Sequence, residues 1–340
     1  RRFPSFWANN IDRAKRIVAH YLLGRKSVDP FPYYVNSRNW ERISVNTKEF
    51  VRNNIAVVDF FEGQTMPSRD MIESFDTFVV GSDQVWRDSY GRVESYFCDF
   101  AKSTNKKRIA YAASFGLGNW QFDNKRTENI KALADEFQAI SVRENDAVGL
   151  CKEYLGLEVL NVLDPTLLME AEDYKELIAK ADLKPSEGDL MVYFLDKNPR
   201  KQEMIKQLEE KRGLKAFTVM PKAVLGKDTR RCSEVCVYPK VEQWLKGFAD
   251  SDFVLTDSFH GMVFSIIFEK PFVVVANKQR GMSRFVALLS LLGLEDRLIL
   301  DSEEVNFENI STNIDFADAK RRLSELKKLS LQFLTTNLEN

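Results

Sequence analysis

The stretch VLTDSFHGMVF, residues 254–264, contains His260, one of only two histidines among 340 residues. It joins an apolar run to a helix-like run, so Asp257 or Ser258 is well placed to cap a helix. The free N–H groups and the dipole of a helix start favour anions, and Gly261 lets a ligand approach the backbone. We predict that His260, Ser258 and Gly261 bind a phosphate or carboxylate. The alternative is a histidine that only packs at a helix start.

A second stretch, VVGSDQVWR at residues 79–87, ends an apolar run with turn residues. Asp83 is predicted to be a hydrogen-bond acceptor or general base that points into a cleft, with Ser82 beside it. Trp86 is predicted to offer a stacking face to a sugar ring. The competing interpretation is an ordinary Ser-Asp helix cap and a core tryptophan.

Polar and basic side chains also follow other strand-like runs. They are Ser114 in AASFG, Arg143 in SVRE, and Lys278, Arg280 and Arg284 in ANKQRGMSR. A guanidinium at a strand end holds a carboxylate or phosphate through two hydrogen bonds. The alternatives are an ion pair between Arg143 and Glu144, and a solvated loop around the last three cations. Ser114 alone is a weak signal.

Strand-like and helix-like stretches alternate along most of the chain. Short runs rich in β-branched and aromatic residues, such as IAVVDF (55–60) and FDTFVVGSD (75–83), stop at turn residues. This alternation predicts parallel sheets flanked by helices, an α/β fold. The pattern restarts after Pro165 and ends with a helix-strand element at 282–294. We therefore predict two consecutive Rossmann-like domains, with ligands bound in the cleft between them.

The predicted boundaries give an N-terminal domain at 1–168, a C-terminal domain at 169–314 and a charged helix at 315–340. Leu323, Leu326 and Phe333 form an apolar stripe on that helix. We therefore expect it to pack back on the N-terminal domain.

Composition excludes several classes of protein. The formal net charge is −1, so nucleic acid is not an expected partner. No apolar run is long enough to span a membrane. The four cysteines are few and unevenly placed, as is typical of a reducing cytoplasm. Walker, HExxH, EF-hand, GxSxG and GxGxxG motifs are missing, and neither a metal nor a cofactor is predicted.

Four segments together resemble the polysaccharide pyruvyl transferase family, in the expected order between about residues 40 and 300. They are FDTFVVGSDQVWR (75–87), AISVREN (139–145), VLDPTLL (162–168) and WLKGFADSDFVLTDSFHGMVFSIIFEKPFVVV (244–275). The resemblance implies two Rossmann-like domains in a GT-B-like arrangement, with the acceptor on the N-terminal and the donor on the C-terminal side. It also implies transfer of pyruvate from phosphoenolpyruvate onto a sugar, as a ketal that bridges two hydroxyls.

The resemblance also suggests roles for individual residues. His260 matches the family's histidine, as phosphate ligand or general acid. Arg143 matches the arginine after the SV strand, which could bind either anionic group of the donor, and Arg284 matches a basic position in the C-terminal domain. Asp83 with Ser82 is the candidate that orients or deprotonates the acceptor hydroxyl. Better-studied members carry S-x-R-x-H, an arginine shortly before the histidine, which this chain lacks. Lys278, Arg280 or Arg284 could replace it.

These observations favour a bacterial cytoplasmic transferase of exopolysaccharide or capsule biosynthesis that decorates a cell-surface glycan or its precursor. Its partners would be phosphoenolpyruvate and a sugar or lipid-linked oligosaccharide. A lipid-linked acceptor would bring it to the inner face of the membrane, and a homo-oligomer is allowed. The alternatives are a GT-B-like glycosyltransferase that uses a nucleotide sugar, and a non-catalytic binding protein of a glycan pathway.

Overall fold

The computed structural model describes residues 14–18, 21, 35–58, 66–196, 198–229, 231–276, 282–302 and 314–339. Contacts divide the chain into two units. One comprises residues 1–62 and 219–244, and the other comprises residues 63–218 and 245–340.

The described part of the first unit is mainly helical. It holds α2 (Ser37–Ile43) and α3 (Val45–Asn54), and the chain then returns at 219–244 with the start of α9 (Val241–Asp250). Tyr238 joins the two pieces, because its N–H donates to Ile43 O over 2.9 Å and its carbonyl accepts from Asn46 Nδ2 over 2.7 Å.

The predicted strand at 55–60 is wrong where the structure describes it. Residues 55–58 lie outside any strand and are exposed, and residues 59–60 lie outside the described residues. Ile55 is instead the C-cap of α3. A β-branched run becomes a strand only where a neighbouring strand takes up its N–H and C=O groups, and 55–58 pair with none in the described part of the chain.

The second unit begins with a four-stranded parallel sheet in the order β1-β2-β3-β4. Its strands are β1 (Thr77–Val80), β2 (Lys107–Ala113), β3 (Ala139–Val142) and β4 (Leu160–Asn161). Apolar residues of α5 (Asn124–Ala134) and α6 (Asn145–Leu150) pack on one face, where Ala110 and Ile140 point. Ile109 and Tyr111 point to the other face. Both faces are buried, as in other parallel sheets.

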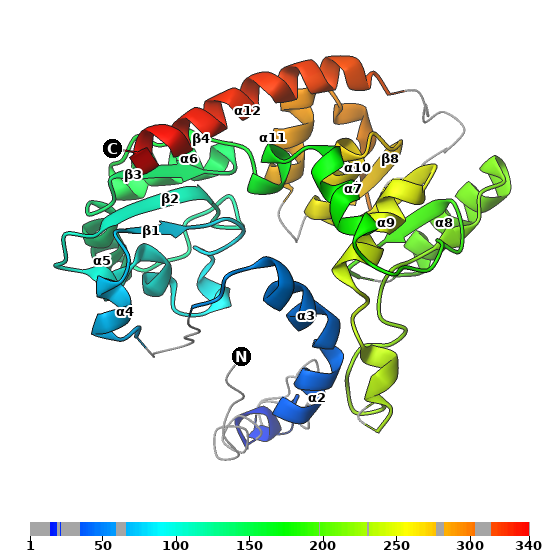
Figure 1. Cartoon of the computed structure of the whole chain (residues 1–340), viewed down its shortest axis with the longest axis horizontal. Helices are drawn as coiled ribbons and strands as arrows, with labels where there is room; N and C mark the ends of the chain where they lie inside the picture. Colours follow the sequence, from blue (N-terminus) through cyan, green and yellow to red (C-terminus); the bar gives the residue numbers. More distant parts are fainter. Residues whose placement is uncertain are drawn as a thin grey trace. The chain divides into compact units, whose positions relative to one another are not determined.

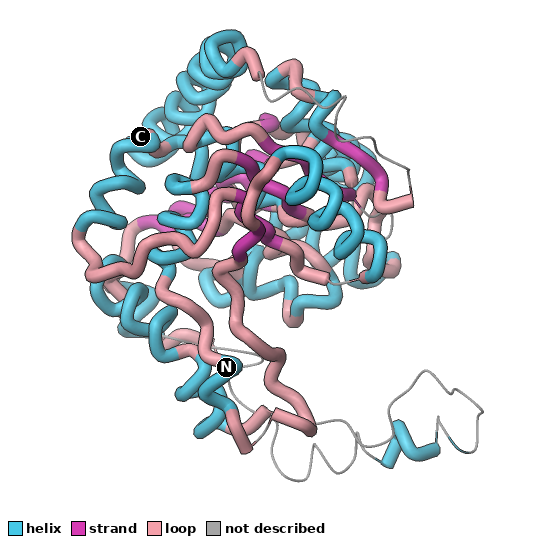
Figure 2. The backbone as a smooth tube through the Cα atoms, turned by 90° about the vertical axis from the view of Figure 1, so that its right-hand side faces the viewer, coloured by secondary structure: helices cyan, strands magenta, loops and turns pink. Residues whose placement is uncertain are grey.

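The second sheet is also parallel and has five strands in the order β6-β5-β7-β8-β9. They are β5 (Leu190–Tyr193), β6 (Ala216–Phe217), β7 (Phe253–Thr256), β8 (Phe272–Ala276) and β9 (Leu298–Leu300). One face packs on Met204 and Leu208 of α8 (Pro199–Arg212). The last predicted helix-strand element, at 282–294, contains the helix α11 (Ser283–Leu292), and β9 follows it in the chain. Figure 2 shows both sets of strands flanked by helices.

The long helix α12 (Phe316–Glu339) covers the second face of the first sheet. Phe333 joins Ile109 and Tyr111 in one buried cluster, and Ser330 Oγ accepts a 3.0 Å hydrogen bond from Leu163 N, just after β4. Figure 1 shows α12 (red) passing α11 and ending beside β3 and β4. This helix therefore fixes the carboxyl end of β4.

The predicted α/β class with two parallel, helix-flanked sheets is confirmed. The domain boundaries at 168 and 314 stay predictions. The remaining helices of the second unit are α4 (Arg69–Glu73), α7 (Ala171–Ala179) and α10 (Phe259–Ile267). Within the described residues, no helix has the length and apolarity that a bilayer crossing requires.

Candidate active site

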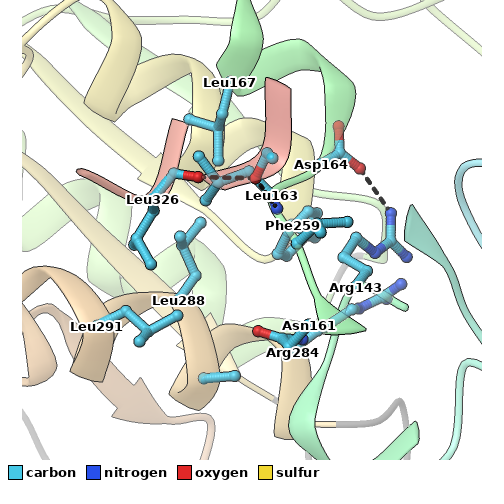
Figure 3. A pocket seen from close by; sticks show the side chains of 13 residues that line it. Arg143, Asn161, Leu163, Asp164, Leu167, Phe259, Arg284, Leu288, Leu291 and Leu326 are labelled. Carbon is cyan, nitrogen blue, oxygen red and sulfur yellow. Dashed lines mark hydrogen bonds and ion pairs between the residues drawn. The ribbon is translucent and has the colours of Figure 1, made fainter. Parts of the chain in front are cut away.

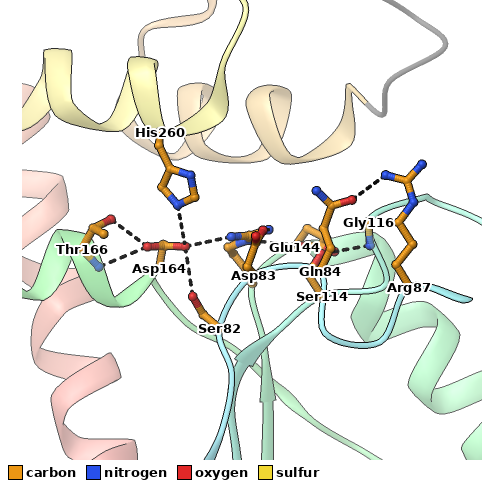
Figure 4. A network of polar contacts seen from close by, with 11 residues as sticks. Ser82, Asp83, Gln84, Arg87, Ser114, Gly116, Glu144, Asp164, Thr166 and His260 are labelled. Carbon is orange, nitrogen blue, oxygen red and sulfur yellow. Dashed lines mark hydrogen bonds and ion pairs between the residues drawn. The ribbon is translucent and has the colours of Figure 1, made fainter. Parts of the chain in front are cut away.

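Polar residues from the carboxyl ends of all four strands of the first sheet meet in one network (Figure 4). They are Ser82 and Asp83 after β1, Ser114 after β2, Arg143 and Glu144 after β3, and Asp164 after β4. Because parallel strands end at the same edge of a sheet, residues distant in sequence come together there. The network continues to His260 of α10, beside the second sheet.

Asp164 lies at the centre of this network and is buried. Its Oδ1 accepts hydrogen bonds from Thr166 N (3.1 Å) and Thr166 Oγ1 (2.7 Å). Its Oδ2 lies 2.8 Å from Arg143 Nη1, 3.4 Å from Ser82 Oγ and 3.8 Å from His260 Nε2. Burial alone would raise the pKa of Asp164, but the interaction with His260 and the charge of Arg143 outweigh burial and hold the pKa below its usual range. Asp164 is therefore a buried carboxylate that stays ionised.

Arg143 is enclosed by carboxylates rather than open to a ligand. Its side chain is 2% exposed, and besides Asp164 it reaches Asp83 Oδ1 at 3.3 Å and Glu144 Oε2 at 3.7 Å. Burial would lower the pKa of Arg143, but Asp164, Glu144 and Asp83 outweigh burial and raise it. The ion pair with Glu144, the alternative to anion binding, is thus present. The main role of Arg143 in this structure is to neutralise buried acids.

Glu144 is buried, and burial favours the neutral form of its carboxyl group. Ser114 Oγ donates a 2.5 Å hydrogen bond to Glu144 Oε1, and both residues are buried. Glu144 Oε2 has no hydrogen-bond partner within the described part of the chain. Burial raises the pKa of Glu144, although Arg143 and the hydrogen bond from Ser114 oppose it. The predicted substrate contact of Ser114 is not visible here, because its hydroxyl is used inside the network.

Asp83 is the accessible carboxylate of the site. Its side chain is 57% exposed, and its backbone has φ of 59°, a left-handed conformation that is uncommon for a residue other than glycine. The turn is held because Asp83 O accepts hydrogen bonds from Val85 N (2.8 Å) and Ser114 N (3.1 Å). Strained residues often lie at functional sites, which fits the predicted role of Asp83 in proton transfer.

The start of α10 places His260 next to this network. Ser258 is the N-cap, and its Oγ accepts a 3.3 Å hydrogen bond from Gly261 N. A Cβ at Gly261 would lie 2.2 Å from Thr256 Oγ1, so this glycine lets the helix approach the end of β7. Both residues therefore have local structural roles besides the predicted contact with an anion.

Three positively charged or ionisable groups surround the ring of Phe259. The Arg143 guanidinium lies 4.8 Å and the Arg284 guanidinium 5.8 Å from its centroid, and the His260 ring forms a T-shaped pair with it at a centroid distance of 5.5 Å. The His260 side chain is 38% exposed. Among the described residues no carboxylate forms an ion pair with Arg284, and Arg284 Nε has no hydrogen-bond partner. Burial and then repulsion from Arg143 lower the pKa of Arg284.

A model of one protein family matches most of the chain. This model, described as polysaccharide pyruvyl transferase, matches residues 6–279. The chain belongs to the polysaccharide pyruvyl transferase family. No protein of curated function matches it significantly.

Solved structures of some glycosyltransferases and polymerases resemble this chain only weakly in backbone arrangement and in sequence. A glycosyltransferase from Rickettsia africae ESF-5 is 13% identical, with 86% of each chain covered and a TM-score of 0.45. A variant of the wall teichoic acid polymerase TagF is 11% identical, with 90% of this chain and 99% of that chain covered and a TM-score of 0.39. With such scores, these likenesses add nothing to the family assignment.

In this member of the family, Ser258 stands two residues before the histidine, where S-x-R-x-H places an arginine. The N-cap position explains the serine locally, since it satisfies a free N–H of α10. Among the three predicted substitutes, Arg284 is the described one, and it forms no ion pair with a carboxylate of the described residues, although Asp83 and Glu144 influence its charge. Lys278 and Arg280, the other predicted substitutes, lie outside the described residues.

The prediction that Trp86 stacks on a sugar is wrong. Trp86 is fully buried, stacks on Phe97 with a centroid distance of 4.5 Å, and donates from Nε1 to Tyr96 O over 3.1 Å. Its ring is enclosed by the core aromatics Phe97 and Phe115, and its polar atom is hydrogen-bonded. The competing interpretation, a core tryptophan, is the correct one.

A small cavity lies beside the network and reaches Arg143 and Arg284 (Figure 3). Its other walls are mainly apolar, with Leu163, Leu288 and Leu326 among them. Its volume of about 20 Å³ has room for little more than one water molecule. This apolar cavity is therefore too small to hold a sugar or phosphoenolpyruvate.

Sequence reasoning missed Asp164, Glu144 and Phe259 as members of the site. The local pattern marks Asp164 only as the end of a strand, and Glu144 only as a surface acid beside Arg143. Their position along the chain is the signal that could have identified both acids, because each lies shortly after a strand of the same parallel sheet. Phe259 carries no such signal.

Proposed function

We propose that this protein is a pyruvyl transferase that moves pyruvate from phosphoenolpyruvate onto two hydroxyls of a sugar in a cell-surface glycan or its precursor. Family membership supports a transferase of this kind. The observation that carries the proposal is the surroundings of Phe259. There a partly exposed imidazole, His260, lies beside Arg284, a cation without a carboxylate partner among the described residues.

Arg284 is the proposed ligand of the donor. Phosphoenolpyruvate carries a phosphate and a carboxylate, and a guanidinium can bind either through two hydrogen bonds. Arg143 also lies beside the ring of Phe259, but it is buried and already paired with Asp164 and Asp83. Bringing an anion to Arg284 would also relieve the repulsion between the two guanidiniums.

The chemistry assigned to the site starts with a proton. Protonated His260 gives its proton to the methylene carbon of phosphoenolpyruvate, whose double-bond electrons form the new C–H bond and leave a cation at the central carbon. A sugar hydroxyl attacks this carbon and gives its proton to Asp83, the exposed carboxylate. The C–O bond to phosphate then breaks, and phosphate leaves with the electron pair. A second hydroxyl closes the ketal and loses its proton to the phosphate.

Donor binding can be measured without knowing the acceptor. Isothermal titration with phosphoenolpyruvate should show saturable binding, and Arg284→Gln should weaken it about 10- to 100-fold, because a charged hydrogen bond is worth about 1.5–3 kcal/mol. The matched control is Arg321→Gln, since Arg321 is an exposed arginine of α12 that pairs with Asp318. Saturable binding of a nucleotide sugar, with none of phosphoenolpyruvate, would instead favour the glycosyltransferase alternative.

Turnover is the second test. Release of phosphate from phosphoenolpyruvate should depend on a sugar with a suitable pair of hydroxyls. His260→Ala should lower that rate by at least about 100-fold with little change in Tm. A rate unchanged by His260→Ala would point to a binding protein. The acceptor, its lipid carrier, the cytoplasmic location and any contact with a membrane stay predictions.

A further inference from the structure

The contact between Asp164 and His260 determines which nitrogen of the imidazole is available. Nε2 of His260 lies 3.8 Å from Asp164 Oδ2, and Figure 4 shows the ring pointing from α10 toward that carboxylate. This distance is longer than a hydrogen bond, but catalytic hydrogen bonds are often long in ligand-free structures and shorten in the complex. Within the described part of the chain, Nδ1 of His260 has no hydrogen-bond partner.

Asp164 is too firmly held to turn away from the histidine. Thr166 fixes Oδ1 with a backbone N–H and a hydroxyl, and Arg143 and Ser82 approach Oδ2. The strand end that carries Asp164 is fixed as well, because Leu163 O accepts a 2.9 Å hydrogen bond from Tyr111 OH. The carboxylate is buried and ionised, so it attracts an N–H of the imidazole strongly.

We infer that Asp164 is a positioning residue that holds the Nε2–H of His260, so that Nδ1 is the nitrogen that exchanges a proton with the ligand. The hydrogen bond made by one ring nitrogen sets the protonation of the other. Only the identity of the ligand rests on the proposed function.

In the proposed reaction the protonated ring carries hydrogens on both nitrogens. The Nδ1–H bond breaks as the C–H bond of the methyl group forms, and the N–H electron pair stays on Nδ1. The ring is left neutral with its proton on Nε2, facing Asp164. A proton that returns to Nδ1 after ketal formation restores the starting state.

The tautomer can be observed directly by NMR. The chain has only two histidines, His20 and His260, so ¹⁵N-histidine labelling gives two sets of ring signals, which His20→Gln assigns. At alkaline pH, where imidazole is neutral, we expect His260 of the wild type to carry its hydrogen on Nε2. Asp164→Asn should give a mixture of tautomers. Asp83→Asn is the matched control, since it also removes a carboxylate partner of Arg143 but does not contact His260.

Each outcome decides the inference. A wild-type ring with its hydrogen on Nδ1, or an unchanged tautomer in Asp164→Asn, would overturn it. If Asp164→Asn does not fold, a wild-type ring with its hydrogen on Nδ1 would still overturn the inference. With an active acceptor, Asp164→Asn should lower kcat about 100-fold or more while KM for the donor changes little. A wild type that binds no phosphoenolpyruvate would refute the proposed function, but the tautomer would still be measured independently.

Discussion

Gly81 connects β1 to the turn that carries Ser82 and Asp83, and it offers a sharp test of the site's construction. Its φ is +130°, and a Cβ there would lie 1.9 Å from the carbonyl oxygen of Tyr111 in β2. Ordinary contact begins near 3.4 Å, so the end of β1 and the backbone of β2 must separate by about 1.5 Å to accept Gly81→Ala. This movement would shift Asp83 away from Arg143.

Gly91 provides the matched control, because its φ is +126° and no atom lies within 4 Å of the place that a Cβ would occupy there. Gly91→Ala should cost only the backbone strain, about 1–3 kcal/mol. Gly81→Ala should cost the same strain and, in addition, about 2 kcal/mol or more from the broken contact between the strands. For a unit of this size, each 1 kcal/mol corresponds to about 2–4 °C in Tm.

The two variants are compared by urea unfolding and by thermal scans, followed by titration with phosphoenolpyruvate. We expect Gly81→Ala to have the lower free energy of unfolding and the weaker ligand binding. Equal stability of the two variants would refute the reasoning, because it would mean that β1 and β2 do not approach each other closely at this point.

Two further predictions concern buried groups around the network. Burial raises the pKa of Glu144, so its stabilising contribution is full below the ordinary glutamate pKa and is lost as pH rises through the folded value. Glu144→Gln should therefore raise Tm at pH 7, with a gain that shrinks toward about pH 4 in scans across pH; a lower Tm at pH 7 would contradict this. Ser330→Ala leaves the buried N–H of Leu163 without its acceptor and should cost about 1–3 kcal/mol in urea unfolding. The exposed Ser324→Ala on the same helix should cost almost nothing.

The sequence was a good guide to the strands of the two sheets. Runs such as 189–195, 252–256 and 271–277 are apolar because both faces of a parallel sheet are buried, and each contains a strand of the structure. The run 55–60 has the same composition but no partner strand where it is described. Composition reports a preference for extended backbone, whereas a strand also needs a neighbour, which local sequence does not specify.

The site was harder to predict, because its contacts join strand ends that are far apart in the chain. His260 lies on α10 and Asp164 beyond the end of β4, and the packing of α10 against the short helix at Pro165–Leu168 brings them together. For Trp86 the sequence predicted a ligand contact where the structure has a core residue. A tryptophan near a turn is compatible with both stacking on a sugar and packing in the core. Burial distinguishes the two, and burial depends on Phe97 and Phe115, which lie outside the quoted motif.

The position of Arg143 explains why acidic side chains lie in a site that is proposed to bind an anionic donor. A carboxylate as buried as Asp164 would normally become protonated, and a neutral acid would hold the histidine only weakly. Arg143 prevents this by supplying a buried positive charge 2.8 Å away. Asp83 also reaches Arg143, whose side chain is 2% exposed, so this guanidinium already has two carboxylate partners and is poorly placed to bind a ligand. In the proposed reaction we therefore expect Arg143 to act through Asp164 and His260, and the donor to be bound by Arg284 of α11.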